Sequence, residues 1–244
     1  MRAARLYVDT ALAANSTLVL PERAAHHAAR VLRLRAGHRL VLFDGRGGEY
    51  DAVIESGPRN AVTVAVGAHR DVERESPLGV VLAQGISGAE RMDFTIQKAV
   101  ELGAAAIQPL ATERSVVRLD AARAETKRAH WQRIVIAACE QCGRNRLPPV
   151  RAPVGVQAFC RDATLPAARW LLAPGASARL ATAATGLAGG AVLAAGPEAG
   201  FSEIEAAALE AAGFRALSLG PRVLRTETAA IAALGALNAL AGDG

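Results

Sequence analysis

Two glycine-containing segments near the C-terminus have the residue types of a ligand-binding site. Residues 196–201 read GPEAGF, and residues 220–228 read GPRVLRTET. Glycine lets the main chain approach a flat ring or a carboxylate closely, and each segment leads into a predicted helix whose first amides are free to bind a ligand. Glycine-proline pairs are also ordinary turn residues, so a purely structural role stays open.

Each segment also carries residues that can start a helix. The hydroxyl of Thr226 can accept a hydrogen bond from a first-turn amide, which predicts Thr226 as the cap of the last helix. Ser202 and Glu205 have the spacing of a capping box, in which the two side chains satisfy each other's amides. We therefore expect the amides just upstream, at Gly200 and Phe201, to point toward a ligand.

The usual nucleotide fingerprints are absent from this sequence. It has no G-x-x-x-x-G-K-[ST] phosphate loop and no G-x-G-x-x-G after a predicted strand. The two segments are therefore expected to hold a cofactor mainly through main-chain groups.

Cys139 and Cys142 form a C-x-x-C pair late in a predicted helix. A structural zinc site would need about two further ligands, and a redox pair would be expected at a strand-to-helix turn. We interpret both cysteines as packing residues and expect no metal. With Cys160 the chain has three cysteines, which cannot all pair within one chain, and this favours a reducing compartment.

The elements that position these residues follow two patterns along the chain. Short β-rich runs separated by turn residues, the second turn at Pro58 to Asn60, occupy 40–45, 49–56 and 61–68. Together with a helix at about 21–32, they predict a small antiparallel barrel or sheet.

From residue 79 onward, strands alternate with helices, which predicts an α/β domain with a mostly parallel sheet. The predicted strands are 79–84, 105–110, 169–174, 191–196 and 215–220. The predicted helices are 90–102, 121–142, 177–184, 203–212 and 227–241. Ligands bind at the carboxyl ends of parallel strands, and we expect the strands before the two glycine segments to be neighbours. We place the domains at 1–72 and 73–244, with a linker at Asp71 to Pro77.

Composition and charge limit the classes of protein to which this chain can belong. No run of about 18 large apolar residues could span a bilayer, and the N-terminus lacks a secretory pattern, so we expect a cytoplasmic protein. The net charge is +5, and residues 113–151 alone hold nine basic against four acidic residues. An arginine-rich segment suits RNA phosphates, and it equally suits a solvated helix face.

Five ordered blocks resemble one known family almost from end to end. The blocks are HHAARVLRLRAGHRLVLFDGRGGEY, RMDFTIQKAVELGAAAIQPLATERSVV, ACEQCGRNRLPPV, AAGPEAGFSEIE and LSLGPRVLRTETAA. In this order they are similar to the signature blocks of the ribosomal RNA small subunit methyltransferase E family, enzymes of the SPOUT class. Five blocks with family-like spacing are far more specific than any single motif.

The resemblance implies a PUA-like N-terminal domain that helps to bind RNA and a C-terminal α/β domain tied in a deep trefoil knot. The knot and the cofactor site would lie at about 169–230. It also implies a homodimer that methylates N3 of a uridine in 16S rRNA with S-adenosylmethionine. The apolar stripe of the last helix, Ile231, Leu234, Leu237 and Leu240, fits a dimer interface or an intramolecular core equally.

By the same resemblance, twelve residues would surround the cofactor. They are Leu172, Ala173, Gly196, Pro197, Glu198, Gly200, Leu219, Gly220, Leu224, Arg225, Thr226 and Thr228. The family usually reads G-P-E-G-G where this chain has Ala199. A residue with a Cβ at positive φ costs about 1 kcal/mol or more, so we expect Ala199 at negative φ and Gly200 in the strained position.

Methylation of N3 requires that the proton of the uracil N3–H leave and that the donor methyl and N3 lie in line. Arg144 is the first candidate to stabilise charge on the uracil carbonyls, with Gln141 orienting the base. A phosphate contact or a helix C-terminal charge explains Arg144 as well. Glu198 is a candidate general base, although a structural acceptor or a partner of Arg225 is the favoured interpretation.

Other basic and polar residues are candidates for RNA contact. They are His26, His27, Arg30, Arg33, Arg114, Ser115, Arg144 and Arg146. Plain surface exposure explains the histidines as well. For Arg114 and Ser115, contact with a partner subunit is an equal functional alternative, and a loop ion pair would be the structural one. Two alternative functions also remain: another SPOUT methyltransferase acting on ribose 2'-O or on tRNA, and a non-catalytic RNA-binding protein, which Ala199 favours.

Overall fold

The computed structural model describes residues 3–56, 61–115, 120–184, 187 and 189–243. The chain divides into two compact units: Met1–Glu75 with Ile136–Leu147, and Ser76–Val135 with Pro148–Gly244. No sequence pattern indicated that residues 136–147 pack with the N-terminal part. The boundary at 72 and 73 stays a prediction, and the turn predicted at 58–60 lies outside the described residues.

The first unit contains a five-stranded sheet. Its strands are β1 (Ala4–Tyr7), β2 (Ser16–Val19), β3 (Arg39–Phe43), β4 (Glu49–Ser56) and β5 (Thr63–Arg70), in the order β1-β3-β4-β5-β2. The three predicted runs correspond to β3, β4 and β5, and these strands pair antiparallel as expected. β2 is also antiparallel to β5, whereas β1 runs parallel to β3. β1 and β2 were not predicted, because four residues are too few for a clear apolar alternation.

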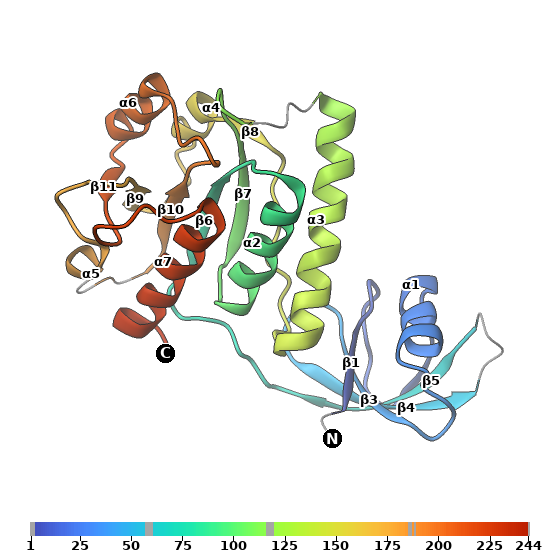
Figure 1. Cartoon of the computed structure of the whole chain (residues 1–244). Helices are drawn as coiled ribbons and strands as arrows, with labels where there is room; N and C mark the ends of the chain where they lie inside the picture. Colours follow the sequence, from blue (N-terminus) through green and yellow to red (C-terminus); the bar gives the residue numbers. More distant parts are fainter. Residues whose placement is uncertain (1–2, 57–60, 116–119, 185–186, 188, 244) are drawn as a thin grey trace. The chain divides into compact units, whose positions relative to one another are not determined.

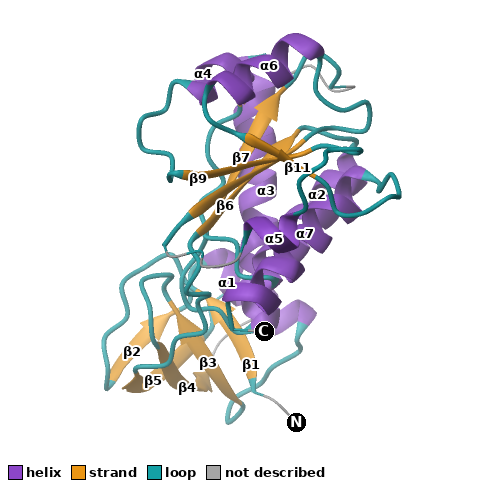
Figure 2. Ribbon diagram, turned by 90° about the vertical axis from the view of Figure 1, so that its left-hand side faces the viewer, coloured by secondary structure: helices purple, strands orange, loops and turns teal. Residues whose placement is uncertain are grey.

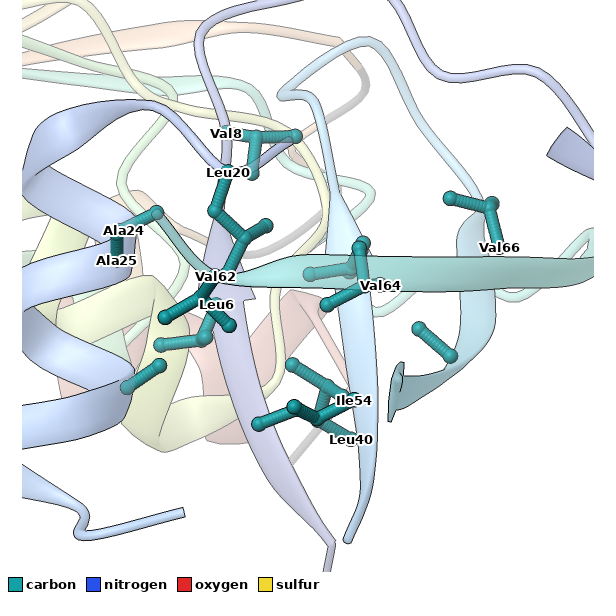
Figure 3. Packing of buried hydrophobic residues seen from close by; sticks show 13 residues of the cluster. Leu6, Val8, Leu20, Ala24, Ala25, Leu40, Ile54, Val62, Val64 and Val66 are labelled. Carbon is teal, nitrogen blue, oxygen red and sulfur yellow. The ribbon is translucent and has the colours of Figure 1, made fainter. Parts of the chain in front are cut away.

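A short helical segment covers one side of this sheet. The helix predicted at 21–32 is α1 (Glu22–His26), continued by a π-helical turn, η1 (His27–Val31). Figure 3 shows Ala24 and Ala25 of α1 beside the strand side chains of the core. The small alanine side chains let the helix approach the sheet closely. The core also contains Leu6, Val8, Leu20, Leu40, Ile54, Val62, Val64 and Val66.

The second unit contains a six-stranded sheet whose paired neighbours are all parallel. Its strands are β6 (Val80–Gly85), β7 (Ala106–Ala111), β8 (Val154–Gly155), β9 (Ala168–Leu172), β10 (Ala191–Ala195) and β11 (Arg215–Leu217). The order is β11-β9-β10-β6-β7-β8. β6 and β10 are buried along their whole length, as expected for central strands with both faces covered.

Helices cover both faces of this sheet. They are α2 (Ala89–Glu101), α4 (Val156–Cys160), α5 (Leu180–Ala183), α6 (Glu203–Ala211), α7 (Thr226–Ala241) and the part of α3 (Ala121–Cys142) up to Val135, which belongs to this unit. α2 and α7 lie side by side (Figure 1). α4 and α6 pack together, and Phe159 of α4, Leu209 of α6 and Phe214, just before β11, lie in one core cluster with strand residues such as Val81 and Val192. The predicted α/β architecture is confirmed, although β8 and α4 were too short to be recognised.

The strand order corrects one expectation about the glycine segments. β10 and β11 are not neighbours, because β9 lies between them. β9 pairs in parallel with both, so the carboxyl ends of all three strands still point the same way. Figure 2 shows β9 and β11 among the strands of this sheet. Three loops therefore leave this edge together, rather than two.

Candidate functional site

A cavity of about 760 Å³ opens at the carboxyl ends of β9, β10 and β11. The segment after β9 contributes Leu172 to Pro174, and the loop after β10 contributes Gly196 to Phe201. The loop after β11 and the first turn of α7 close the other side. Arg91 and Arg114, from elsewhere in the second unit, complete the lining. The volume is within the range of about 300–1,000 Å³ that is usual for small-molecule sites.

The cavity brings together eleven of the twelve residues predicted to surround a cofactor. They are Leu172, Ala173, Gly196, Pro197, Glu198, Gly200, Leu219, Gly220, Leu224, Arg225 and Thr226. Thr228 is absent from the lining and its side chain is exposed.

Other residues of the lining were missed as cofactor contacts. Arg91 is one helix turn into α2, and Glu227 lies directly after Thr226. No local pattern singled out Arg91. Glu227 stood inside the quoted 220–228 segment, and its acidic type at a helix start was the available signal.

The loop after β10 is shaped by two glycines. A Cβ on Gly196 would lie 3.0 Å from Cα of Gly200 and 3.1 Å from the nitrogen of Phe201, so the turn leaves no room for a side chain. Gly200 has φ +69°, and its amide donates to the carbonyl oxygen of Pro197 at 2.9 Å, so the expectation that this amide points toward a ligand is wrong. Ala199 is not among the described residues with positive φ, which confirms the expected division of roles between the two positions.

The predicted capping box at the start of α6 is confirmed. The hydroxyl of Ser202 accepts from the amide of Glu205 at 3.2 Å, and the Glu205 carboxylate accepts from the amide of Ser202 at 2.9 Å. The second oxygen of Glu205 accepts from the amide of Glu113 at 2.9 Å. The loop after β7 is thereby tied to the loop after β10.

The capping role predicted for Thr226 is wrong, although the residue does start the last helix and does line the cavity. α7 begins at Thr226, its N-cap is Arg225, and no side chain caps the helix. The hydroxyl of Thr226 instead donates to the carbonyl oxygen of Gly196 at 2.6 Å. Nε2 of Gln84, at the end of β6, lies 3.0 Å from the Thr226 hydroxyl and 3.3 Å from the same carbonyl oxygen. The hydroxyl thus joins two cavity loops instead of satisfying its own helix.

Glu198 has a structural partner, but it is not Arg225. Oε1 of Glu198 accepts from the amide of Gly88 at 2.9 Å and from Arg91 at 2.7 Å. Burial raises the pKa of Glu198, but the hydrogen bonds from Gly88 and Arg91 outweigh this effect, and the pKa lies below its ordinary value. A carboxylate held ionised in this way is a weaker proton acceptor, which favours the structural interpretation.

Arg114 and Ser115 lie in the loop after β7. Arg114 donates to the carbonyl oxygens of Ala199 at 3.2 Å and Phe201 at 3.1 Å. Ser115 is buried, and its hydroxyl lies 2.8 Å from that of Thr112. The bonds of Arg114 go to main-chain carbonyls rather than to a carboxylate, so among the described residues they do not form the loop ion pair considered for it. Contact with RNA stays a prediction for both residues.

The remaining predicted site residues belong to the first unit. Arg144 is only 4% exposed, and its guanidinium pairs with Glu75, with Nε 3.1 and 3.2 Å from the two carboxylate oxygens. Arg146 lies 3.7 Å from Glu73. Gln141 is exposed. The catalytic roles proposed for Arg144 and Gln141 stay predictions.

Four of the residues predicted to contact RNA, His26, His27, Arg30 and Arg33, lie on or just after α1 and η1. His27 is 3.4 Å from the Glu140 carboxylate. His26, Arg30 and Arg33 are exposed, and Arg33 adopts φ +54°. An exposed basic group of this kind suits phosphate contacts.

The three cysteines are free, and Cys139 is buried. Burial raises the pKa of the Cys139 thiol to about 12, which makes it a poor nucleophile at neutral pH. Within the described part of the chain, no three or more His, Cys, Asp or Glu side chains are grouped to hold a metal ion. Of the described helices, none has the length and apolar character that a membrane crossing would require.

Comparison with protein families matches both parts of the chain. Residues 74–238 match the model of an RNA methyltransferase domain, and residues 20–67 match that of an RNA methyltransferase PUA domain. The chain is 32% identical to the ribosomal RNA small subunit methyltransferase E of Buchnera aphidicola, covering 99% of this chain and 98% of that protein. It is 36% identical to the Mycobacterium tuberculosis protein of the same name, covering 98% of this chain and 93% of that protein.

Two solved structures are similar over their whole length. A putative methyltransferase from Legionella pneumophila, in complex with the bound cofactor SAM, has 42% identity and a TM-score of 0.95, with 100% of both chains covered. A ribosomal RNA small subunit methyltransferase E from Neisseria gonorrhoeae, bound to S-adenosyl methionine, has 37% identity and a TM-score of 0.91, with 99% of both chains covered. Both similarities include the strands and loops that form the cavity.

Proposed function

Because this chain belongs to the ribosomal RNA small subunit methyltransferase E family, we propose that it transfers a methyl group from S-adenosylmethionine to N3 of a uridine in 16S rRNA. The observation that carries the proposal is the cavity at the ends of β9, β10 and β11, in a fold similar from end to end to two structures solved with this cofactor. The PUA-type match supports RNA as the substrate.

The cavity fits S-adenosylmethionine in size and in chemistry. Apolar side chains of Leu172, Phe201, Leu219 and Leu224 offer surfaces for a flat ring. The tight turn at Gly196 leaves main-chain groups to recognise the polar edges of such a ring. We propose that the eleven predicted residues of the lining hold the cofactor, whose sulfonium supplies an activated methyl group.

The residues of the chain then have to bind the cofactor and the uridine, orient them toward each other and exclude water. The Thr226 to Gly196 bond fixes the distance between the two loops, so the cavity keeps its width. The bonds from Arg114 to Ala199 and Phe201 hold the outer part of the same loop. A rigid arrangement keeps donor and acceptor close and collinear, which is the main requirement of an in-line methyl transfer.

Ala199, the residue that favoured a non-catalytic protein, no longer supports that alternative. Ala199 was unusual for the family motif, but its negative φ shows that the loop accepts alanine without strain. Gly200 retains the positive φ that the turn needs.

Several finer properties are part of the same proposal. We expect a deep trefoil knot at about 169–230, a cytoplasmic location and a homodimer. On α7, Leu234 and Leu237 are buried within the chain, whereas Leu240 is 49% exposed, so only the end of the apolar stripe is available to a second copy. Sedimentation as a monomer at micromolar concentration would contradict the dimer.

The proposed reaction is tested by analysing the modified nucleoside. Small subunits and free 16S rRNA from cells lacking this protein are incubated with the purified protein and labelled S-adenosylmethionine, and the nucleosides are identified by mass spectrometry. N3-methyluridine is the expected product. A methyl group on ribose, a product only on tRNA, or no binding of the cofactor at millimolar concentration would contradict the proposal.

A further inference from the structure

One acidic side chain of the cavity has a buried oxygen without a partner. Six buried side-chain N or O atoms in the described part of the chain lack a hydrogen bond, and they belong to Arg5, Gln84, Ser87, Asp93, Trp131 and Glu227. Of these six residues, Glu227 is the one that lines the cavity. A buried polar atom without a partner costs about 1–3 kcal/mol, so a position that retains one in a ligand cavity is a candidate for contact with the ligand.

The neighbouring carboxylate is already engaged. Glu198 and Glu227 are the two acidic residues of the lining. Oε1 of Glu198 accepts both from Gly88 and from Arg91. The hydrogen bond and charge of Glu198 are the main reasons why the pKa of Arg91 is raised, and the charge of Glu227 contributes less. Arg91 therefore hydrogen-bonds to Glu198, and Oε2 of Glu227 has no hydrogen-bond partner.

Glu227 lies on a firmly held part of the cavity wall. It lies in the first turn of α7, where the helix amides favour a negative charge. Its chain neighbour Thr226 is held by Gly196 and Gln84, so the main chain beneath Glu227 is fixed. An acceptor on a rigid element is well placed for chemistry that needs accurate geometry.

The proposed reaction lacks one component that this oxygen can provide. Uridine N3 carries a hydrogen, and the in-line transfer of a methyl group to N3 requires that this proton leave. We propose that Glu227 is the general base of the reaction, with Oε2 accepting the N3 proton of the uridine. This inference rests on the proposed function.

The step balances in atoms and charge. The N3–H bond breaks, its proton moves to Oε2 of Glu227, and its electron pair forms the new bond from N3 to the methyl carbon. The bond from sulfur to that carbon breaks, and its electron pair stays on sulfur, which becomes neutral. A carboxylate and a sulfonium are thus replaced by a carboxylic acid and a thioether. A weak base suffices, because N3 becomes more acidic as the methyl group bonds to it.

The test compares Glu227→Gln with the wild type and with Glu203→Gln. Glu203 also lies in the first turn of a helix, is exposed, and is absent from the cavity lining, so its variant repeats the charge change elsewhere. Affinity for S-adenosylmethionine is measured by calorimetry, and the single-turnover rate of N3-methyluridine formation on small subunits is followed between about pH 7 and pH 9. Loss of a general base should lower this rate about 100-fold or more in Glu227→Gln.

If Glu227 is the general base, Glu227→Gln should show two further results that a variant of a structural residue would not show together. Cofactor affinity should stay close to that of the wild type, which also shows that the variant is folded. The residual rate of Glu227→Gln should rise by about tenfold per pH unit, because hydroxide then removes the N3 proton, while the wild-type rate changes far less. Glu203→Gln should match the wild type.

Three outcomes would overturn the inference. Unchanged turnover of Glu227→Gln would remove Glu227 from the reaction. Weakened cofactor affinity with an unchanged rate at saturation would make it a cofactor ligand instead. A rate loss with no change in pH dependence would make it a structural residue. If the wild type itself makes no N3-methyluridine, the proposed function fails. The wild-type sample alone therefore distinguishes failure of the proposed function from failure of this inference.

Discussion

The hydroxyl of Thr226 donates a 2.6 Å hydrogen bond to the carbonyl oxygen of Gly196, and so joins two loops that are 30 residues apart in the chain. Gln84 of β6 donates to both partners from the sheet side. The cavity of this methyltransferase is therefore held by a side-chain bridge between its two glycine segments. The bridge explains why a threonine that caps no helix stands at the start of α7.

Replacing Thr226 with valine should loosen the cavity. Thr226→Val keeps the shape of the side chain but removes the donor to Gly196 and the acceptor for Gln84. Loss of a buried hydrogen bond with one group left unsatisfied should lower the free energy of unfolding by about 1–3 kcal/mol. Urea unfolding measures this change, and calorimetry should show weaker binding of S-adenosylmethionine. Thr226→Ser retains the hydroxyl and is the matched control; equal behaviour of the two variants would refute the bridge.

Substitutions of Ala199 and Gly200, in the loop after β10, should change the free energy of unfolding by different amounts. Gly200→Ala places a Cβ at φ +69°, and since the added atom would meet nothing within 4 Å, the cost is conformational, about 1–2 kcal/mol. Ala199→Gly changes a residue with negative φ, so it should cost only about 0.4–1 kcal/mol through the entropy of the unfolded chain. Thermal unfolding of both variants measures the difference. A more stable Ala199→Gly protein would show that Ala199 is strained.

The ion network around Glu49 should make the first unit sensitive to acid. Glu49 is 2% exposed and pairs with Arg5, with Arg70 at 2.7 Å and with Arg74 at 3.4 Å. Burial raises the pKa of Glu49. The hydrogen bond from Arg5 and the charges of Arg5, Arg70 and Arg74 together lower it by more, so the pKa lies below the ordinary value of 4.5. The stabilisation is then fully present above the unfolded-state pKa and is lost as the pH falls through the lower native pKa.

A pair of variants checks this network. Glu49→Gln leaves the buried Arg5 without its carboxylate and should cost about 3–5 kcal/mol at neutral pH, while reducing the loss of stability in acid. Asp51→Asn removes an exposed carboxylate 3.2 Å from Arg70 and should cost less than about 1 kcal/mol. Unfolding free energies at pH 7 and below pH 4.5 give both comparisons. Similar costs for the two variants would argue against a buried network.

Arg144 is expected to act on the uracil carbonyls, and its ion pair with Glu75 provides a way to examine this role. Arg144→Ala should abolish turnover and leave cofactor affinity nearly unchanged, because the guanidinium would stabilise charge only in the transition state. Glu75→Gln keeps the guanidinium but weakens its anchor, so it should retain measurable turnover. Breaking a buried pair can cost about 3–5 kcal/mol, so both variants are assayed at low temperature after their folding is checked by circular dichroism. Equal loss of turnover in both would assign Arg144 a structural role.

The sequence by itself determined the longer elements of the second unit, although not β8 and α4, and the segments that form its cavity. Hydrophobic periodicity, glycine-proline turns and the Ser202 to Glu205 capping box are local patterns, so α3 and the capping box were predicted correctly. Only the tertiary structure decided which distant groups meet. It inserted β9 between β10 and β11, paired Glu198 with Arg91 rather than Arg225, and left Oε2 of Glu227 without a partner. Such pairings can join residues more than 100 positions apart in the chain, as Arg91 and Glu198 show. They depend on the strand order and on how the loops fold back, and a local sequence pattern encodes neither.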